Sequence, residues 1–202
     1  MPRTVDHQER RAQIAEGLIR LAGREGLHAV TMRAVAAESD VSLRLVQYYF
    51  KDKSRLMHAA LQYLERQSHE RWQTRLSKIP NPPSLRSFLE TLLAEALPTD
   101  ERSRTFHLVW TSYAVLAMTN TEFAARPFIE GPNRLEKRVA EALEDAQEAG
   151  ELAADLDASI EAARLLALNH GLGTSVLVGQ QTAETAMAVF KHHLDQLFSQ
   201  KN

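Results

Sequence analysis

Cysteine is absent from this 202-residue sequence. The chain therefore offers no disulfide bond, no thiolate ligand for a metal and no cysteine nucleophile. Long hydrophobic runs are absent too: no stretch reaches the roughly 20 apolar residues that span a bilayer, and no charged start precedes an apolar stretch as in a signal peptide. We expect a cytoplasmic protein with no membrane partner.

Glycine is scarce, and the eight glycines form no phosphate-binding loop, dinucleotide fingerprint or nucleophile elbow. Gly171 and Gly173 stand close together, but they lack the third glycine and the preceding strand of a dinucleotide site. His192 and His193 are adjacent, so on a helix their side chains point about 100° apart and cannot bind one metal ion together. We predict no enzymatic activity, no cofactor and no metal site.

Positive charge is concentrated at the start of the chain, although the net charge is −2. Residues 1–60 carry ten basic and seven acidic side chains, which gives +3, and the remaining 142 residues carry 14 and 19, which gives −5. This asymmetry directs the basic end toward a polyanion such as nucleic acid. Hydrophobic residues make up 44% of the chain, which is enough for a sizeable core.

Residues 31–50 predict two short helices joined by a tight turn. Thr31 and Ser42 are favourable N-caps, because each hydroxyl can accept a hydrogen bond from a backbone N–H that the helix leaves unpaired. Asp40 stands where the chain must reverse, and aspartate tolerates a left-handed backbone better than most residues other than glycine. The pattern is typical of a helix-turn-helix, whose second helix enters the major groove of DNA.

The second of these helices has two different faces. Val46 and Phe50 lie four residues apart and form an apolar face that packs inward. The other face offers a methyl-contacting group, a guanidinium, an amide and a phenol, which suit base edges and phosphates: Leu43, Arg44, Gln47 and Tyr48. The first helix of the chain, expected over residues 6–25, carries Arg10 and Arg11, and Arg3 precedes it. We expect these three arginines to lie on a solvated face, with phosphate contact as the alternative.

Residues 8–56 resemble the N-terminal domain of the TetR family of bacterial transcriptional repressors. The resemblance is carried by Thr31, Val35-Ala36, Val41-Ser42, Tyr49-Phe50-Lys51, Lys53 and Leu56. It departs at Asp40, where the family usually has glycine, and at Gln47, where the family often has tyrosine. The resemblance implies an all-α homodimeric repressor that binds a palindromic operator and whose C-terminal domain usually accepts a small ligand that releases the DNA.

The resemblance also assigns roles to residues. It implies base or backbone contacts at the start and middle of the second helix and phosphate contacts beside it, and the predicted DNA-binding residues are Thr31, Arg33, Ser42, Leu43, Arg44, Gln47, Tyr48 and Lys53. We therefore place a three-helix DNA-binding domain at residues 1–53 and a helical regulatory, ligand-binding and dimerisation domain at residues 54–202.

The second domain is expected to contain helices throughout. Asp52 caps a long helix that begins at Lys53, and three prolines within residues 78–83 end it. Residues 119–131 are expected to be irregular. Apolar residues at helical spacing predict helices over 53–76, 84–97, 101–118, 132–149, 157–179 and 182–198.

The last two helices are expected to form the subunit interface. The helix over 157–179 is apolar nearly all round, so it must be buried on more than one side. Gly171, Gly173 and Thr174 are small enough for close packing against a second copy. We predict an isologous homodimer with a four-helix interface, which matches the symmetry of a palindromic operator.

A ligand site is expected among residues that the resemblance places around a central cavity of the second domain. An apolar lining with a few polar groups is usual for small-ligand sites. The candidates are Phe88, Leu92, Phe106, Trp110, Tyr113, Asn169 and His170, and their aromatic content favours a small apolar or aromatic ligand. The alternative is that these residues are ordinary core.

The sequence as a whole predicts a DNA-binding transcriptional regulator, released from its operator by ligand through a shift of the helix that begins at Lys53. Two alternatives stay open. One is a constitutive dimeric repressor or architectural factor without a ligand. The other is a helical small-molecule-binding protein or enzyme in which the helix-turn-helix is incidental.

Overall fold

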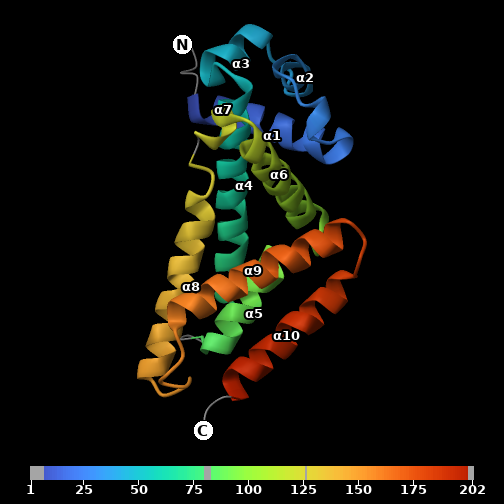
Figure 1. Cartoon of the computed structure of the whole chain (residues 1–202). Helices are drawn as coiled ribbons and strands as arrows, with labels where there is room; N and C mark the ends of the chain where they lie inside the picture. The colour runs from blue at the N-terminus through green and yellow to red at the C-terminus, as the bar shows by residue number, and fades with distance from the viewer. Residues whose placement is uncertain (1–6, 80–82, 126, 200–202) are drawn as a thin grey trace. The chain divides into compact units, whose positions relative to one another are not determined.

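The computed structural model describes residues 7–79, 83–125 and 127–199, and these residues form ten α-helices and one short 3₁₀ helix, with no β-strand among them (Figure 1). The predicted all-α fold is confirmed. No helix in these three ranges has both the length and the apolar character needed to cross a membrane. By contacts the chain divides into two compact units, residues 1–67 with 108–128 and residues 68–107 with 129–202.

The first unit is built on three helices near the N-terminus and on the start of a fourth. They are α1 (His7–Glu25), α2 (Met32–Glu38), α3 (Leu43–Phe50) and α4 (Lys53–Leu76), with the 3₁₀ helix η1 (Leu27–Ala29) between α1 and α2. The unit also holds the later part of α6 (Glu101–Thr119) and the short α7 (Thr121–Ala124). Apolar side chains spaced by three and four fill its core, among them Ile14, Leu18, Val35, Val46, Phe50 and Met57.

Helices α1 and α2 approach each other closely at Gly17. A Cβ atom built on Gly17 would lie 1.9 Å from Ser39 Oγ and 3.1 Å from Ser39 Cβ. The Gln13 side-chain amide also donates to the Ser39 carbonyl at 2.8 Å. Glycine in a helix interior costs about 0.5–1 kcal/mol relative to alanine, so Gly17 is explained here by the space that Ser39 occupies.

The turn between α2 and α3 has the predicted left-handed residue. Asp40 has a φ of 51°. The Val41 N–H then donates to the Ala36 carbonyl at 3.0 Å, which satisfies a carbonyl that α2 leaves unpaired at its end. This turn sets the direction in which α3 starts.

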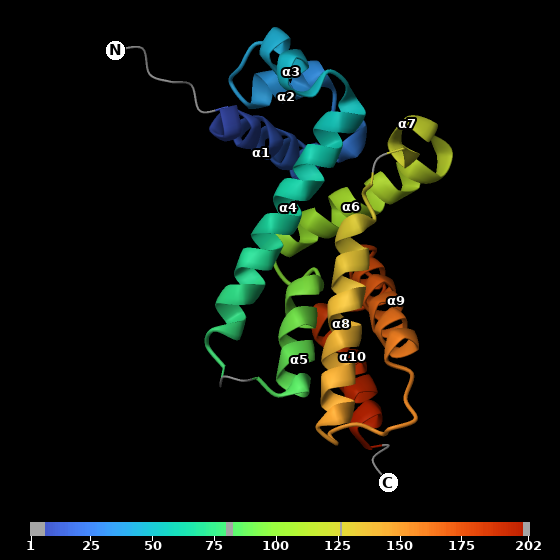
Figure 2. The ribbon, with the colours of Figure 1, turned by 90° about the vertical axis from the view of Figure 1, so that its left-hand side faces the viewer.

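The second unit contains α5 (Leu85–Ala96), α8 (Glu130–Glu148), α9 (Ala158–Leu177) and α10 (Ala183–Ser199), with the later part of α4 and the start of α6. Helix α9 packs against α8 and α10, and α5 contacts all three (Figure 2). The core is made of leucine, valine, alanine and aromatic side chains, including Leu89, Leu143, Leu165, Phe190 and Leu194.

A buried carboxylate joins α4 to α5 within this unit. Glu95 is only 4% exposed, and it accepts from Arg71 at 2.6 Å and from Ser68 at 3.1 Å. Arg75 lies 3.4 Å from its second oxygen. Because a buried carboxylate is costly unless it is paired, this cluster fixes the register of the later part of α4 on α5.

Two sequence predictions need correction. Residues 119–131 are not wholly irregular, because Asn120 caps α7 by accepting from the Glu122 N–H at 2.9 Å. Helix α8 begins at Glu130, so Gly131 and Pro132 lie in its first turn, where proline is tolerated because the N–H it lacks has no helical partner. Helix α4 ends at Leu76, as expected. Residues 80–82 of the predicted proline break lie outside the described residues, and so do Arg3 and Asp6.

Candidate nucleic-acid interface

The exposed face of α3 carries the predicted DNA-reading side chains. Ser42 caps the helix by accepting from the Leu45 N–H at 3.2 Å. Val46 and Phe50 are fully buried beneath it, and Tyr48 is 69% exposed on the other side. Arg44 and Gln47 are exposed as well, and Leu43 is partly exposed. The helix is therefore held by its apolar face, and its polar face is free to enter a groove.

Helix α2 begins beside this face. Thr31 accepts from the Ala34 N–H at 3.1 Å, as expected of an N-cap. A hydroxyl that accepts one hydrogen bond still has its own proton to donate, so Thr31 can also donate to a phosphate oxygen. Arg33, in the first turn of α2, is exposed.

The start of α4 supplies a lysine at a helix N-terminus. Asp52 caps α4 by accepting from the Arg55 N–H at 2.8 Å and from the Ser54 hydroxyl at 2.9 Å, as the sequence predicted. Lys53 follows in the first turn and is partly buried, and this burial lowers the pKa of Lys53 below its usual value. A phosphate oxygen beside Lys53 would meet the ammonium and the positive end of the helix dipole together.

The predicted ligand residues are divided between the two compact units. Trp110 and Tyr113 belong to the first, whereas Phe88, Leu92, Phe106, Asn169 and His170 belong to the second. In the first unit Tyr113 is fully buried, its ring lies 5.4 Å from that of Phe123 and 5.1 Å from that of Phe128, and its hydroxyl donates to the Phe123 carbonyl at 3.4 Å. Tyr113 therefore has the surroundings of a core residue within its unit.

In the second unit, polar groups meet where α6 contacts α9. His107 Nε2 bonds the Ala96 carbonyl at the end of α5, and a Cβ atom on Gly173 would lie 2.8 Å from the His107 ring. The space beside Gly173 is therefore filled by His107 of the same chain, whereas the sequence predicted that Gly173 would pack against a second copy. Burial lowers the pKa of both His107 and His170, which favours the neutral form of both rings. The Oδ1 atom of Asn169, a residue only 6% exposed, finds no donor among the described residues.

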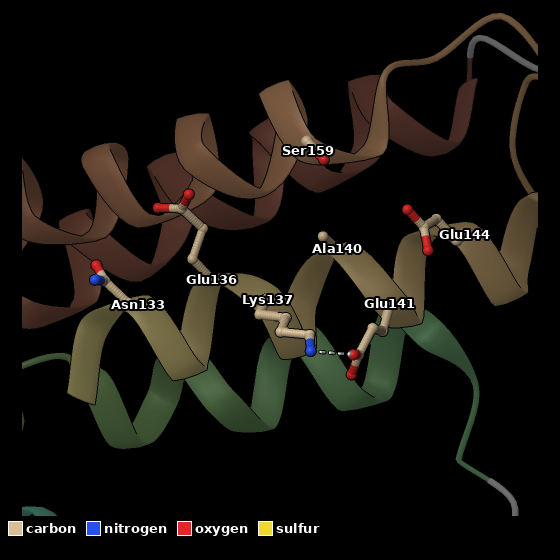
Figure 3. Close-up of a pocket in the computed structure, with 7 residues that line it drawn as sticks. All are labelled: Asn133, Glu136, Lys137, Ala140, Glu141, Glu144 and Ser159. Carbon is tan, nitrogen blue, oxygen red and sulfur yellow. Dashed lines mark ion pairs between the residues drawn. The ribbon is translucent and has the colours of Figure 1, made fainter. Parts of the chain in front are cut away.

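Aromatic and cationic groups meet elsewhere in the second unit. The Arg138 guanidinium lies 4.2 Å from the centre of the Trp72 ring, and the Phe88 ring meets Trp72 edge-on at 5.5 Å. A groove of about 390 Å³ runs between α8 and α9, and six of the residues that line it come from α8 (Figure 3). The lining is acidic and contains none of the seven predicted ligand residues: Asn133, Glu136, Lys137, Ala140, Glu141, Glu144 and Ser159.

Comparison with known protein families decides the class of this molecule. Residues 14–60 match the model of bacterial regulatory proteins of the tetR family, and residues 85–199 match that of the C-terminal domain of BetI-type transcriptional repressors. The chain belongs to the TetR family of bacterial regulators. Both matches fall on regions whose geometry is described above, the first on α1 to α4 and the second on α5 to α10.

Individual relatives of this TetR-family chain agree with the family matches. The transcriptional regulator PksA of Bacillus subtilis is 25% identical over 180 residues, which are 88% of this chain and 83% of PksA. A transcriptional regulator from Saccharomonospora viridis, solved in complex with choline, is 27% identical, with a TM-score of 0.77 over 94% of this chain and 95% of the other. A TetR-family regulator from Rhodococcus sp. has the same fold, with a TM-score of 0.82 at 23% identity over 95% and 99% of the two chains.

The structure of this TetR-family regulator also shows residues that sequence reasoning missed. Arg10 and Arg11 are exposed, as expected of a solvated face, and Arg11 Nη1 also donates to the Tyr49 carbonyl of α3 at 3.1 Å. His7 bonds the Tyr49 hydroxyl at 2.9 Å. No local pattern signals these contacts, because they join residues 38 and 42 positions apart.

Proposed function

We propose that this regulator is a homodimeric repressor that binds a palindromic operator through α3 and is released by a small ligand bound in residues 54–202. The observation that carries the proposal is the state of α3, which is capped by Ser42, anchored by buried Val46 and Phe50 and exposed at Arg44, Gln47 and Tyr48. A helix preformed in this way enters a groove without a further cost of ordering its backbone.

In this proposal, α3 specifies the sequence and its neighbours fix the position on the DNA. Arg44 binds a guanine edge with two donors, Gln47 contacts a second base, and Leu43 packs on a thymine methyl group. Ser42, at the start of α3, contacts a base edge or the DNA backbone. Phosphate contacts come from the surrounding residues Thr31, Arg33, Tyr48 and Lys53. Residues 1–53 thus act as the DNA-binding domain and residues 54–202 as the regulatory domain.

The proposed dimer forms through α9 and α10, and the exposed face of α9 supports it. Ala163, Ala167, Gly171 and Thr174 are spaced by four, four and three and are all exposed, so they form one stripe of small residues. Nothing lies within 4 Å of a Cβ atom built on Gly171. Ile160 and Val178 are 67% and 71% exposed near the two ends of α9. Small and apolar residues at the surface allow close contact with the same helix of a second copy.

For the ligand we propose a small organic cation related to choline, in place of the apolar or aromatic ligand expected from sequence. The support is the choline complex of the Saccharomonospora relative, which is 27% identical to this chain. Aromatic faces bind quaternary ammonium groups, and Phe88 and Phe106 are the aromatic candidates within the second unit. Asn169 Oδ1 is buried and finds no donor among the residues that the structure describes, so it would accept from a ligand hydroxyl. The α8–α9 groove has no aromatic lining residue and is not the site we propose.

The proposed mechanism acts through differential binding. A ligand releases DNA only if it binds one conformation of the dimer more tightly than the conformation that fits the operator. Helix α4 connects Lys53 to the buried Glu95 cluster, so a shift of the later part of α4 is transmitted to its start. We propose that this release takes place in the cytoplasm, where operator DNA and metabolites are both available.

The test is fluorescence anisotropy on an operator selected from random duplexes with the purified protein. We expect sequence-specific binding by a dimer and its loss when choline is added, with sodium chloride at the same ionic strength as the control. Specific binding that no choline concentration weakens would overturn the proposed ligand. The protein would then be a repressor that another ligand releases, or one that no ligand releases. Absence of specific binding would overturn the DNA-binding proposal itself.

A further inference from the structure

Two adjacent arginines at the start of α1 have different surroundings. Arg10 Nη1 donates to the Gln13 side chain at 2.7 Å, within the same helix. Arg11 Nη1 donates instead to the backbone carbonyl of Tyr49 at 3.1 Å. The Arg11 guanidinium also lies 4.7 Å from the centre of the Phe50 ring. Arg11 therefore contacts the C-terminal end of α3, the helix that presents the base-reading side chains.

The carbonyl that Arg11 contacts has no partner within its own helix. The last four carbonyls of an α-helix lack intrahelical donors. At the end of α3, the Lys51 N–H donates to the Gln47 carbonyl at 2.9 Å, and the Asp52 N–H donates to the Phe50 carbonyl at 2.6 Å. Arg11 supplies a donor for the Tyr49 carbonyl between them. A cation at this position is also favourable for the dipole of α3.

A second contact from α1 holds the side chain of the same tyrosine. His7 Nδ1 and the Tyr49 hydroxyl lie 2.9 Å apart, and the two rings meet edge-on at 5.9 Å. The Tyr49 ring in turn meets the Tyr48 ring edge-on at 5.2 Å. The first turns of α1 thus fix Tyr49 at its carbonyl and at its hydroxyl, and Tyr49 supports the exposed Tyr48.

The chain leaves α3 through an unfavourable backbone conformation. Lys51 has φ 59° and ψ −50°, and the hydrogen bond across it joins residues 50 and 52. Such a turn is rare for a residue other than glycine and persists only where the surroundings hold it. The contacts from Arg11 and His7 hold the residues that precede this turn.

From these contacts we infer that Arg11 is a positioning residue for base recognition, acting as a C-terminal cap that α1 supplies to α3. It holds the end of α3 so that Arg44 and Gln47, both within two turns of that end, meet the bases at a fixed angle. Base hydrogen bonds are directional, whereas attraction to phosphates tolerates small rotations. Loss of Arg11 therefore lowers specificity more than non-specific affinity. This inference rests on the proposed reading of DNA by α3.

The experiment compares Arg11→Ala, Arg11→Lys and the matched control Arg10→Ala with the wild-type protein. Kd is measured for the selected operator and for a scrambled duplex across a range of salt concentrations, and the melting temperature is recorded for each variant. For Arg11→Ala we expect the ratio of specific to non-specific affinity to fall about tenfold, with the wild-type slope of log Kd against log salt. Arg11→Lys keeps a cation that can donate to the Tyr49 carbonyl and should recover at least half of this loss on a logarithmic scale.

Arg10→Ala should keep the wild-type ratio of specific to non-specific affinity, because the described hydrogen bond of Arg10 is to Gln13 of its own helix. A slope that falls by about one phosphate in Arg11→Ala, with an unchanged ratio, would overturn the inference and make Arg11 a phosphate ligand. An unchanged ratio and slope would overturn it as well, as would a lysine variant no better than the alanine variant. If the wild-type protein shows no preference for any operator, it is the proposed function that fails.

Discussion

Replacement of Gly17 by alanine tests how closely α1 and α2 pack beneath the recognition helix. The new Cβ atom would lie 1.9 Å from Ser39 Oγ and 3.1 Å from Ser39 Cβ, so rotation of the hydroxyl alone does not make room. Overpacking of this kind costs about 1–3 kcal/mol. Alanine recovers about 0.5–1 kcal/mol of helix propensity, so we expect a net loss of about 1 kcal/mol in the free energy of unfolding.

The assay is thermal and urea denaturation, followed by operator binding. A loss of about 1 kcal/mol corresponds to a fall of about 2–4 °C in melting temperature for a chain of this length. Ser39→Gly removes the group that the new methyl meets, so in the double variant Gly17→Ala/Ser39→Gly the loss caused by Gly17→Ala should nearly vanish. An unchanged or raised melting temperature in Gly17→Ala alone would show that α1 and α2 do not approach as described.

Three further predictions follow from the site and from the second unit. Arg44→Ala should lose about 1–3 kcal/mol of discrimination at one base pair, whereas Lys53→Ala should weaken all duplexes alike and reduce the salt slope by about one phosphate, both measured as Kd on operator variants. Gly171→Glu should convert the dimer into a monomer of 22.7 kDa in light scattering, and a dimer that survives this charge would exclude α9 from the interface. Burial lowers the pKa of His107 and His170 below 6.5, so their contribution to stability is complete above pH 6.5 and is lost as pH falls through the lowered pKa values. Urea midpoints at pH 7 and pH 5 should show this loss and His107→Gln should reduce it, whereas a wild-type midpoint equal at the two pH values would contradict it.

Local signals in the sequence predicted much of the DNA-binding region. Thr31, Ser42 and Asp52 cap the helices expected of them, and Asp40 adopts the left-handed conformation. These features depend on residues within three or four positions of one another, so a single sequence contains the information. The apolar residues Val46 and Phe50 likewise fixed which face of α3 is exposed.

Contacts between distant helices could not be predicted in the same way. The sequence shows that a glycine stands at position 173 of an expected helix, but it does not show that the His107 ring packs against this glycine. An arginine on a polar helix face, such as Arg11, is usually solvated, and its hydrogen bond to the Tyr49 carbonyl arises from the packing of α1 against α3. The compact units divide the chain by contacts, and α4 and α6 each contribute to both units, so the functional domains 1–53 and 54–202 stay a prediction. The proposed ligand residues stay a prediction for the same reason.

In vitro selection of random duplexes on the purified 202-residue chain tests whether α3 reads operator DNA as part of a symmetric dimer. We expect enrichment of a palindrome whose half-sites are centred about one helical turn apart, because a symmetric dimer presents two copies of α3 to one face of the DNA. Repeating the selection with Arg44→Ala should relax the preference at one position of each half-site. Enrichment of no sequence by the wild-type protein, or of one without two-fold symmetry, would contradict recognition of a palindromic operator by a symmetric dimer.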